Sequence, residues 1–159
     1  MIRTYMPSDL DTLKQITITC FEGVSIDHNI YRLLGDVGAV DWQTRKARHI
    51  DQDVTAQPDG VFVWEEEGEP IGYITARLNN ESKIGWIPNL AVLPGNQGKG
   101  IGKALMKEAL DYFEANGMVG AKIETLDQND IGQEFYPRSG FTEVARQVHY
   151  VMRLEDRKV

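Results

Sequence analysis

Apolar residues follow two different periods along this chain, and the change from one to the other separates helices from strands. Before residue 54 and again after residue 100, apolar residues recur every three or four positions, which predicts amphipathic helices. Between these regions lie short runs rich in Val, Ile, Tyr and Trp, bounded by Gly, Pro and Asn, which predict strands. Helices are expected at residues 9–21, 41–53, 100–116 and 127–138, with a weaker one at 30–38. Strands are expected at 2–5, 61–64, 71–78, 84–92, 121–126, 141–145 and 147–154.

The order of these elements predicts a mixed α/β (α+β) fold. Strands joined by short turns pair with their sequence neighbours, so the sheet should be mostly antiparallel, with six to seven strands and about four flanking helices. Pro88 interrupts the strand expected at 84–92, and because proline cannot donate a ladder hydrogen bond it indicates a bulge or a local splay. Residues 22–29 are expected to form a loop because of their glycine and polar content. No linker divides the chain, so residues 1–159 are expected to form one domain.

Composition narrows the classes of function. The chain has 17 Lys and Arg against 24 Asp and Glu, a formal net charge of −7, which disfavours nucleic acid as a partner because such binding depends on neutralising phosphates. An acidic surface suits a cationic small molecule better. The single cysteine, Cys20, allows no intramolecular disulfide; with no signal peptide or membrane-length apolar run, this predicts a soluble, cytoplasmic protein that binds no membrane. No His and Cys spacing suits zinc, so no metal is expected.

A glycine-rich turn between an expected strand and a long expected helix is the clearest candidate site. Glycines let the backbone approach a ligand closely, and the first turn of a helix offers unpaired N–H groups, so the segment 94–103 suits a pyrophosphate. Lys99 and Lys103 add positive charge. A P-loop would need Lys and Ser or Thr where Ile101 and Gly102 stand, and a Rossmann turn would need glycine at Lys103, so neither pattern fits.

The spacing Gln97-x-x-Gly100-x-Gly102 resembles the acyl-coenzyme A pyrophosphate loop of the GNAT superfamily of N-acetyltransferases. The expected order of elements along essentially the whole chain is also similar to that of this family. The resemblance implies acetyl-coenzyme A as the co-substrate. The residues it implies for the pyrophosphate are Gln97, Gly98, Lys99, Gly100, Ile101, Gly102 and Lys103.

A second set of residues resembles another signature of the same family: Asn129-x-x-Gly132-x-x-Phe135-Tyr136, followed by Gly140 and Phe141. On a helix, Asn129, Gly132 and Tyr136 share one face. The resemblance implies that Asn129 bonds the pantetheine arm and that Tyr136 lies near the sulfur, where a phenol can protonate the leaving thiolate. The alternative for Tyr136 is a core tyrosine with a satisfied hydroxyl.

The resemblance also gives a role to the backbone just before the glycine-rich turn. The main chain of Leu90 and Val92 would pair with pantetheine as if it were another strand. The Leu90 N–H would then be the donor to the oxyanion. Pro88 is compatible with the splayed strand that such pairing requires.

The general base is where this sequence departs from the family pattern. Some members place a Glu or His on the strand before the loop, but the corresponding positions here are Trp86 and Pro88. A base elsewhere, a water chain and capture of a neutral amine all remain open, and Glu124 is the candidate on the neighbouring strand. The expected wall of the acceptor site includes Glu22, Asp27, His28, Tyr31 and Trp42. Ordinary packing of Phe21, Ile26 and Trp42 is the equally supported alternative for this region.

Together these patterns predict an enzyme that moves an acetyl group from acetyl-coenzyme A to a primary amine by direct attack in a ternary complex. The acceptor is expected to be a small-molecule amine or a peptide amine. The alternative is a coenzyme A-binding module that senses or regulates and transfers nothing; a nucleotide-binding domain is weaker, because the P-loop residues are missing. Edge strands at the C-terminal end of the sheet would allow a homodimer.

Overall fold

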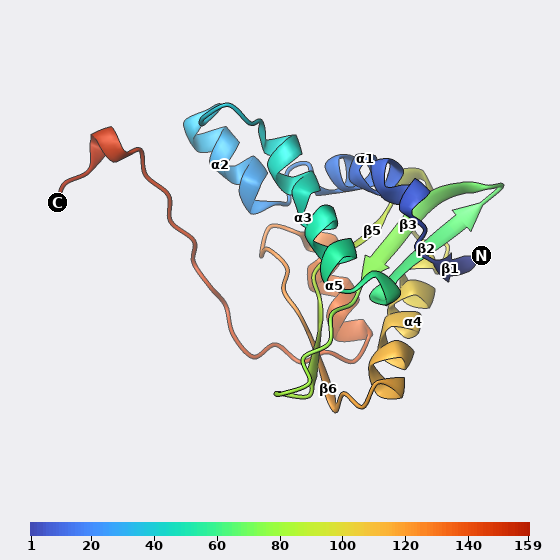
Figure 1. Cartoon of the computed structure of the whole chain (residues 1–159). Helices are drawn as coiled ribbons and strands as arrows, with labels where there is room; N and C mark the ends of the chain where they lie inside the picture. The colour runs from blue at the N-terminus through green and yellow to red at the C-terminus, as the bar shows by residue number, and fades with distance from the viewer.

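Two β-sheets of different size form the centre of the fold, and helices cover both faces (Figure 1). The computed structural model describes residues 1–159. The larger sheet is antiparallel, with strand order β1-β2-β3-β5, and the smaller one is the parallel pair β4-β6. An isolated bridge between Arg77 and Trp86 connects the end of β3 to β4. The strands are β1 (Ile2–Thr4), β2 (Val61–Glu66), β3 (Glu69–Thr75), β4 (Ile84–Ile87), β5 (Leu90–Val92) and β6 (Gly120–Ile123).

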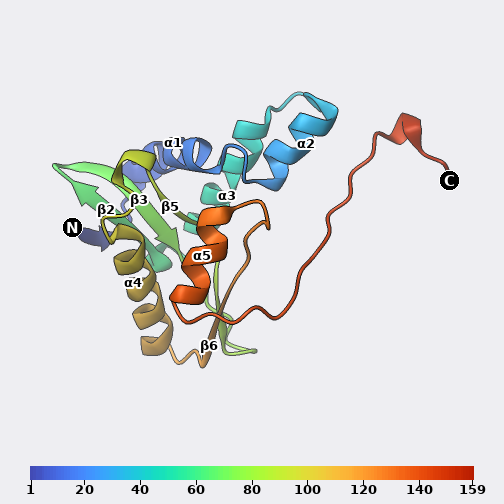
Figure 2. The same ribbon diagram turned by 180° about the vertical axis from the view of Figure 1, so that it is seen from behind.

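Five α-helices surround the sheets, and three of them begin at a side chain that caps the first turn (Figure 2). The oxygen atoms of Ser25, Asp41 and Asn129 accept hydrogen bonds from backbone N–H groups at the starts of α2, α3 and α5. None of the helices is both long and apolar enough to cross a membrane. The helices are α1 (Leu10–Phe21), α2 (Ile26–Leu34), α3 (Trp42–Ala56), α4 (Ile101–Ala115) and α5 (Asp130–Arg138), and 3-10 turns lie at Pro7–Asp9, Pro58–Gly60, Pro94–Asn96 and Leu154–Asp156.

Alternation along β2 and β3 divides the core between the two faces of the larger sheet. Phe62 and Ile74 point to α4, whose buried stripe includes Leu105 and Phe113. Val63 and Tyr73 point to the other face, where they pack in one cluster with residues of α1 and α3. The larger sheet is therefore buried on both sides, and its residues near the open end of β5 are held rigidly in place.

The predicted fold class is confirmed: the protein is a mixed α/β fold with a mostly antiparallel sheet. Helix α4 lies within one residue of the predicted bounds at each end. The single strand expected at 84–92 is instead two strands, β4 and β5, separated at Pro88 and Asn89. The loop expected at 22–29 is wrong for its second half, because Ser25 accepts a hydrogen bond from the His28 N–H and starts α2 at Ile26.

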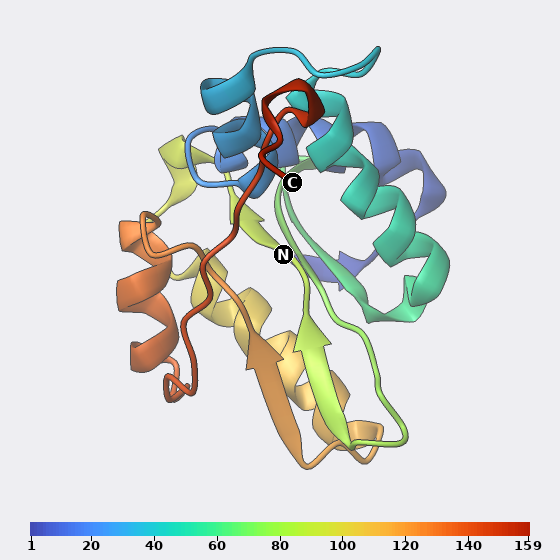
Figure 3. The ribbon, with the colours of Figure 1, turned by 90° about the vertical axis from the view of Figure 1, so that its left-hand side faces the viewer.

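The two strands predicted at 141–145 and 147–154 are also wrong. After Phe141 the chain runs as an extended segment with no strand partner, and it ends in a 3-10 turn at Leu154–Asp156 (Figure 3). We call residues 142–154 the C-terminal arm. A strand needs a neighbour for its backbone hydrogen bonds, and the chain provides none for the arm.

Candidate functional site

The two sheets diverge where β5 and β6 would otherwise become neighbours. The pairing of β4 with β6 stops at Ile87 and Ile123, and the chain then enters β5, which pairs with β3 instead. Since β5 is the last strand in its sheet, its second edge faces no strand. The divergence at Pro88 leaves an opening between β5 and the segment that follows β6.

The hydrogen-bond alternation along β5 decides which backbone groups face this opening. Thr75 N–H donates to the Asn89 C=O (2.9 Å), and Leu93 N–H donates to the Ile71 C=O (2.9 Å). In an antiparallel ladder every second residue bonds the partner strand, so the N–H and C=O groups of Leu90 and Val92 point away from β3. These are the backbone groups that the sequence predicted for pantetheine.

The glycine-rich turn follows directly and ends in the first turn of α4. Gly98 and Gly100 take φ values of +77° and +83°, which favour glycine, and a Cβ at either would meet open space. No side chain caps α4, and its first helical bond runs from the Ala104 N–H to the Gly100 C=O (3.0 Å). The N–H groups of Ile101, Gly102 and Lys103 therefore have no acceptor within the helix.

The polar side chains of this turn have different surroundings. The Gln97 amide donates to the Val92 C=O (3.1 Å), so it ties the turn to β5. Lys99 donates to the Asn96 side chain (2.9 Å). Lys103 is exposed and makes no ion pair within the protein. A negative ligand at the helix end would meet free N–H groups and at least this one free ammonium.

Helix α5 brings Asn129, Gly132 and Tyr136 to one place, as the spacing predicted. A Cβ on Gly132 would lie 3.0 Å from Nδ2 of Asn129, 3.1 Å from the Tyr136 ring and 2.6 Å from Oγ1 of Thr125, so only glycine fits. Asn129 caps the helix, and its Nδ2 donates to Oγ1 of Thr125 (3.0 Å), so both ends of its amide already have protein partners. The Tyr136 ring packs edge-on against Phe135 and Phe141.

The Tyr136 hydroxyl makes no hydrogen bond to another protein group, and burial raises its pKa to about 12. A phenol with that pKa keeps its proton throughout the neutral range. Tyr136 is half-buried and its hydroxyl has no protein partner, so this hydroxyl is available to a ligand.

The acceptor-wall residues are held mainly by contacts with one another. The His28 ring stacks on Trp42 (4.4 Å between centroids) and lies 6.1 Å from Tyr31, and its Nδ1 accepts the Gly23 N–H. Trp42 is only 4% exposed, so it packs in the interior, whereas Tyr31 is 39% exposed.

The carboxylates predicted for this wall differ from each other. Asp27 pairs with Nε of Arg45 (3.2 Å) and lies 3.8 Å from Nε2 of His49. Glu22 is exposed and makes no ion pair.

Side-chain hydrogen bonds join this wall to the segment between β6 and α5. The amides of Gln128 and Asn29 exchange two hydrogen bonds, each 2.9 Å long, and Nε2 of Gln128 also donates to the Gly23 C=O (2.6 Å). The loop after α1 and the loop before α5 are therefore neighbours, and together they border the same end of the sheet as β5.

Glu124, the candidate base, lies one residue beyond β6 and is exposed. Its Oε2 accepts the indole N–H of Trp86 (2.7 Å), and its other oxygen lies 3.6 Å from Lys122. Trp86 cannot itself act as a base, and its indole N–H instead fixes the carboxylate of Glu124 just beyond β6.

A buried polar cluster beside β5 was missed by the sequence analysis. Asp53, only 2% exposed, accepts hydrogen bonds from Thr75 (2.8 Å), Asn89 (2.8 Å) and Arg77 (2.6 and 2.9 Å). Lys46, 8% exposed, donates to Oδ1 of Asn89 (2.9 Å) and lies 3.4 Å from Nδ1 of His49. The signal was a Lys and an Asp on the apolar side of the helix at 41–53, seven residues apart.

Burial lowers the pKa of both basic side chains of this cluster, Lys46 and His49. It lowers the pKa of Lys46 to about 8, against the opposing charges of Asp27 and Asp53. Burial and then the Lys46 charge lower the pKa of His49. Such displaced values are common at functional sites and also occur in structural ion networks.

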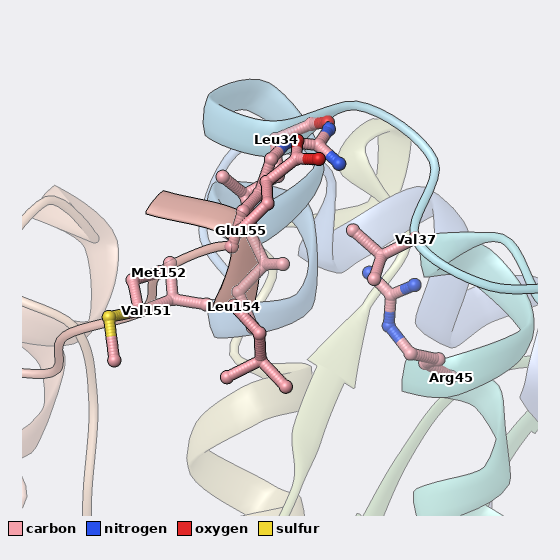
Figure 4. Close-up of a pocket in the computed structure, with 9 residues that line it drawn as sticks. Leu34, Val37, Arg45, Val151, Met152, Leu154 and Glu155 are labelled. Carbon is pink, nitrogen blue, oxygen red and sulfur yellow. The ribbon is translucent and has the colours of Figure 1, made fainter. Parts of the chain in front are cut away.

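One pocket lies away from the glycine-rich turn. It measures about 550 Å³ and is bordered by α2, Arg45 and the end of the C-terminal arm (Figure 4). A second pocket of about 410 Å³ is bordered by Arg77, Trp86 and Lys122. Neither of these two pockets is lined by Leu90 or Val92, the residues whose backbone faces the opening beside β5.

Comparison with known proteins decides the family. A family model described as the acetyltransferase (GNAT) family matches residues 27–141. The chain belongs to the GNAT family. The match runs from α2 through α5 to Phe141, so it includes the opening, the glycine-rich turn and the Asn129–Tyr136 face. The resemblance seen in the motifs is thereby confirmed.

Individual GNAT relatives agree with this assignment. A mycothiol acetyltransferase from Streptomyces avermitilis is 37% identical over 84 residues, which is 53% of this chain and 27% of that protein, so the chain spans about a quarter of this curated relative's length. PH1933 from Pyrococcus horikoshii OT3 has a TM-score of 0.74 at 20% identity over 93% of this chain and 92% of that one. PaiA N-acetyltransferase from Thermoplasma acidophilum, in complex with coenzyme A, has a TM-score of 0.70 at 18% identity over 89% of each chain.

Proposed function

We propose that this protein transfers an acetyl group from acetyl-coenzyme A to a primary amine, by direct attack in a ternary complex. The observation that carries the proposal is the continuity between the outward-facing backbone of Leu90 and Val92 and the uncapped, glycine-rich start of α4. A ligand that carries an amide-containing arm next to a pyrophosphate would use both surfaces at once. Acetyl-coenzyme A has this chemistry.

In this arrangement the backbone binds most of the co-substrate. Pantetheine lies along the free edge of β5 as an added strand. The pyrophosphate accepts hydrogen bonds from the N–H groups of Ile101, Gly102 and Lys103, with Gly98 and Gly100 giving the close approach and Lys99 and Lys103 the positive charge. Gln97 has a supporting role, because its amide holds the turn against Val92.

The chemistry then needs an oxyanion donor and an acid. The amine nitrogen attacks the thioester carbon, and the Leu90 N–H stabilises the oxygen of the tetrahedral intermediate. As the C–S bond breaks and the amide forms, Tyr136 gives its proton to the departing thiolate sulfur. The nitrogen loses its second proton as it becomes the neutral amide, and that proton restores the phenol of Tyr136. Its pKa of about 12, set by burial, keeps that proton in place until the thiolate appears.

The attacking ammonium must first lose a proton, and we propose Glu124 as the group that accepts it. Glu124 follows β6 on the far side of the opening from β5, and the Trp86 indole fixes one of its oxygens (2.7 Å). A water chain or capture of a neutral amine are the other routes. A Glu124→Gln variant distinguishes them: the acid limb of the kcat/KM profile is lost if Glu124 is the base and persists if it is not.

We propose a small-molecule or peptide amine as the acceptor, bound between the loop after α1 and the start of α2. The net charge of −7 favours a cationic acceptor, and Glu22 is the wall carboxylate with no cation paired to it. Asp27, His28 and Tyr31 would shape this wall, with the interior side chain of Trp42 supporting the His28 ring from behind. The mycothiol acetyltransferase relative makes a small-molecule acceptor the first one to test.

Binding and turnover separate the enzyme from its alternative, a coenzyme A-binding module that transfers nothing. We expect acetyl-coenzyme A, and neither ATP nor NAD, to raise the melting temperature, by roughly 5 °C at a hundredfold excess over Kd. We also expect free thiol to be released when amines are added. A melting shift without thiol release from any amine panel would support the sensing module. No shift at saturating ligand would remove the assignment of the turn.

Tyr136→Phe tests the acid. We expect kcat to fall by roughly 10²-fold while the Kd for acetyl-coenzyme A stays within twofold, since proton transfer contributes in that range. Tyr112→Phe is the matched control, because its hydroxyl bonds Asp59 and Gln57 on the other side of the core. An unchanged kcat in Tyr136→Phe would remove Tyr136 from the mechanism.

A further inference from the structure

The paired strands β4 and β6 have one covered face and one open face. A Cβ on Gly85 would lie 2.5 Å from the Phe113 ring of α4, and Ile123 packs against the core cluster that contains the buried residues of this helix. Because side chains alternate along a strand, Trp86 and Lys122 point to the opposite face. Figure 3 shows the pair from that side, and no helix lies across it.

A pocket of about 410 Å³ lies on this open face. Trp86 and Lys122 line it together with Arg77, which bridges to Trp86 from the end of β3. The turn between β3 and β4 adds Asn79 and Ser82. Both cations lie over the Trp86 ring, with the guanidinium carbon of Arg77 5.4 Å and Nζ of Lys122 5.5 Å from its centroid. The pocket therefore combines an aromatic surface with two positive charges.

The side-chain groups of this pocket that are left without a protein partner are hydrogen-bond donors. One carboxylate oxygen of α3 accepts from Nε and Nη2 of Arg77, which leaves Nη1. Oδ1 of Asn79 accepts two backbone N–H groups, which leaves its Nδ2, and Oγ of Ser82 accepts one, which leaves its O–H. The nearest carboxylate oxygen to Nζ of Lys122 is that of Glu124, at 3.6 Å. Donors that converge without an acceptor indicate an anionic ligand.

The pocket adjoins the proposed catalytic base. Glu124 lies two residues after Lys122, and its Oε2 accepts the indole N–H of Trp86 (2.7 Å), which lines the pocket. Glu124 would repel a simple anion, whereas a ligand with both an ammonium and an anionic group satisfies the carboxylate and the pocket together. The formal charge of −7 acts on the ammonium at long range, and the pocket acts within hydrogen-bond distance, so the two effects do not conflict.

We propose that the acceptor carries a carboxylate or phosphate group close to its amine, and that this group binds in the pocket between Arg77 and Lys122. The proposal rests on the proposed function and narrows its acceptor to amines that also bear a negative charge, such as amino acids, short peptides and phosphorylated amino alcohols. The anionic group accepts hydrogen bonds from Nη1 of Arg77 and Nζ of Lys122. The carbon chain of the acceptor lies on the Trp86 ring, and its amine reaches Glu124.

Matched pairs of acceptors test the need for this negative charge. We compare kcat/KM for short peptides with a free C-terminal carboxylate and for the same peptides as C-terminal amides, and likewise for phosphoethanolamine and ethanolamine. The charged member of at least one pair should be preferred by roughly 10–100-fold, the range for a charge-assisted hydrogen bond. The pair with the larger ratio identifies the group as a carboxylate or a phosphate. Ratios within twofold of one in both pairs overturn the proposal.

Lys122→Gln assigns the preference to the pocket. We expect it to reduce the ratio of charged to neutral acceptor by roughly tenfold, and Lys122→Arg to keep most of it. The ratio compares two acceptors on one protein, so an effect of Lys122 on Glu124 that is common to both cancels. The matched control is Lys107→Gln, which removes the same charge from an exposed position on α4 paired with Asp111. A ratio that survives Lys122→Gln, or falls equally in Lys107→Gln, overturns the assignment.

Calorimetric titration of the same four kinds of acceptor separates the pocket from the proposed function, because binding needs no turnover. The charged member of a pair should bind the wild type more tightly than the neutral one, and Lys122→Gln should abolish the difference. If this difference in Kd is present and no amine is acetylated, the anion site stands and the proposed function fails. If amines are acetylated with no difference in Kd or kcat/KM, the proposed function stands and the anion site fails.

Discussion

Lys46 donates a hydrogen bond to Asn89 inside the protein, with Nζ 2.9 Å from Oδ1, and Asn89 directly precedes Leu90 on the candidate catalytic strand. No carboxylate pairs directly with this ammonium. Its other neighbours are Nδ1 of His49 (3.4 Å) and the face of the Phe21 ring (4.1 Å). A buried charge with only neutral partners is costly, which is why the pKa of Lys46 falls to about 8.

This lowered pKa predicts a specific pH dependence of stability. The unfolded chain holds the Lys46 proton up to pH of about 10.5, whereas the folded protein releases it near 8, so stability rises with pH between these values. From pH 7 to 9.5 the wild type should gain about 2 kcal/mol relative to Lys46→Met, which cannot titrate. Urea unfolding of both proteins at the two pH values measures the difference, and parallel curves would show that Lys46 titrates normally.

Asp53 should be essential to the same cluster. Asp53→Asn leaves the Arg77 guanidinium without its carboxylate and disturbs the bonds to Thr75 and Asn89, so we expect a loss of about 3–5 kcal/mol in the free energy of unfolding. Asp51→Asn, two residues earlier on the same helix, breaks only the surface pair with Lys14 (2.8 Å) and should cost about 0–1 kcal/mol. Equal losses in the two variants would contradict this account.

Two helical glycines should respond oppositely to alanine. Gly132→Ala puts a Cβ 2.6 Å from Oγ1 of Thr125 and should destabilise the protein by about 1–3 kcal/mol. Gly102→Ala meets only the Phe135 ring at 3.7 Å, so it should be neutral or stabilise by up to about 1 kcal/mol through helix propensity. Thermal unfolding measures both, and a stabilised Gly132→Ala would show that α5 can move away from Thr125.

Cys20 should be a slow nucleophile. Burial raises the pKa of its thiol to about 11, and Sγ lies 3.4 Å from the Val92 C=O. At neutral pH its thiolate fraction is then roughly a hundredfold below that of an ordinary cysteine, and alkylation should slow in proportion. Because Cys20 is the single cysteine, a disulfide reagent reports on it alone. Labelling as fast in the folded protein as in urea would contradict the prediction.

Local signals in the sequence were sufficient for much of the fold. The start and end of α4 followed from glycines at both ends and an apolar face at Ile101, Leu105 and Phe113, and all three are buried. Pro88 predicted a splay, and the sheets do divide there. Each of these features depends on the chemistry of residues close together in the chain, so the pattern of neighbouring residues is enough to predict it.

Features that depend on distant partners could not be predicted in the same way. The buried polar cluster joins Lys46 and Asp53 of α3 to Asn89 at the junction of β4 and β5. The spacing of these residues in the sequence does not indicate that they are in contact. The alternation of the arm did predict a strand, but a strand forms only beside another one. Ser25 was a readable helix cap that the glycine and polar content of its loop concealed.

Helix α2 has consequences for how this fold can diversify. None of its nine residues is buried, so it contributes little to the core that supports β5 and α4. One side of it borders the proposed acceptor site, and its end borders the pocket that the C-terminal arm also lines. Substitutions along α2 can therefore reshape the acceptor side at small cost in folding stability. The half of the molecule that holds the co-substrate can stay constant while relatives come to accept different amines.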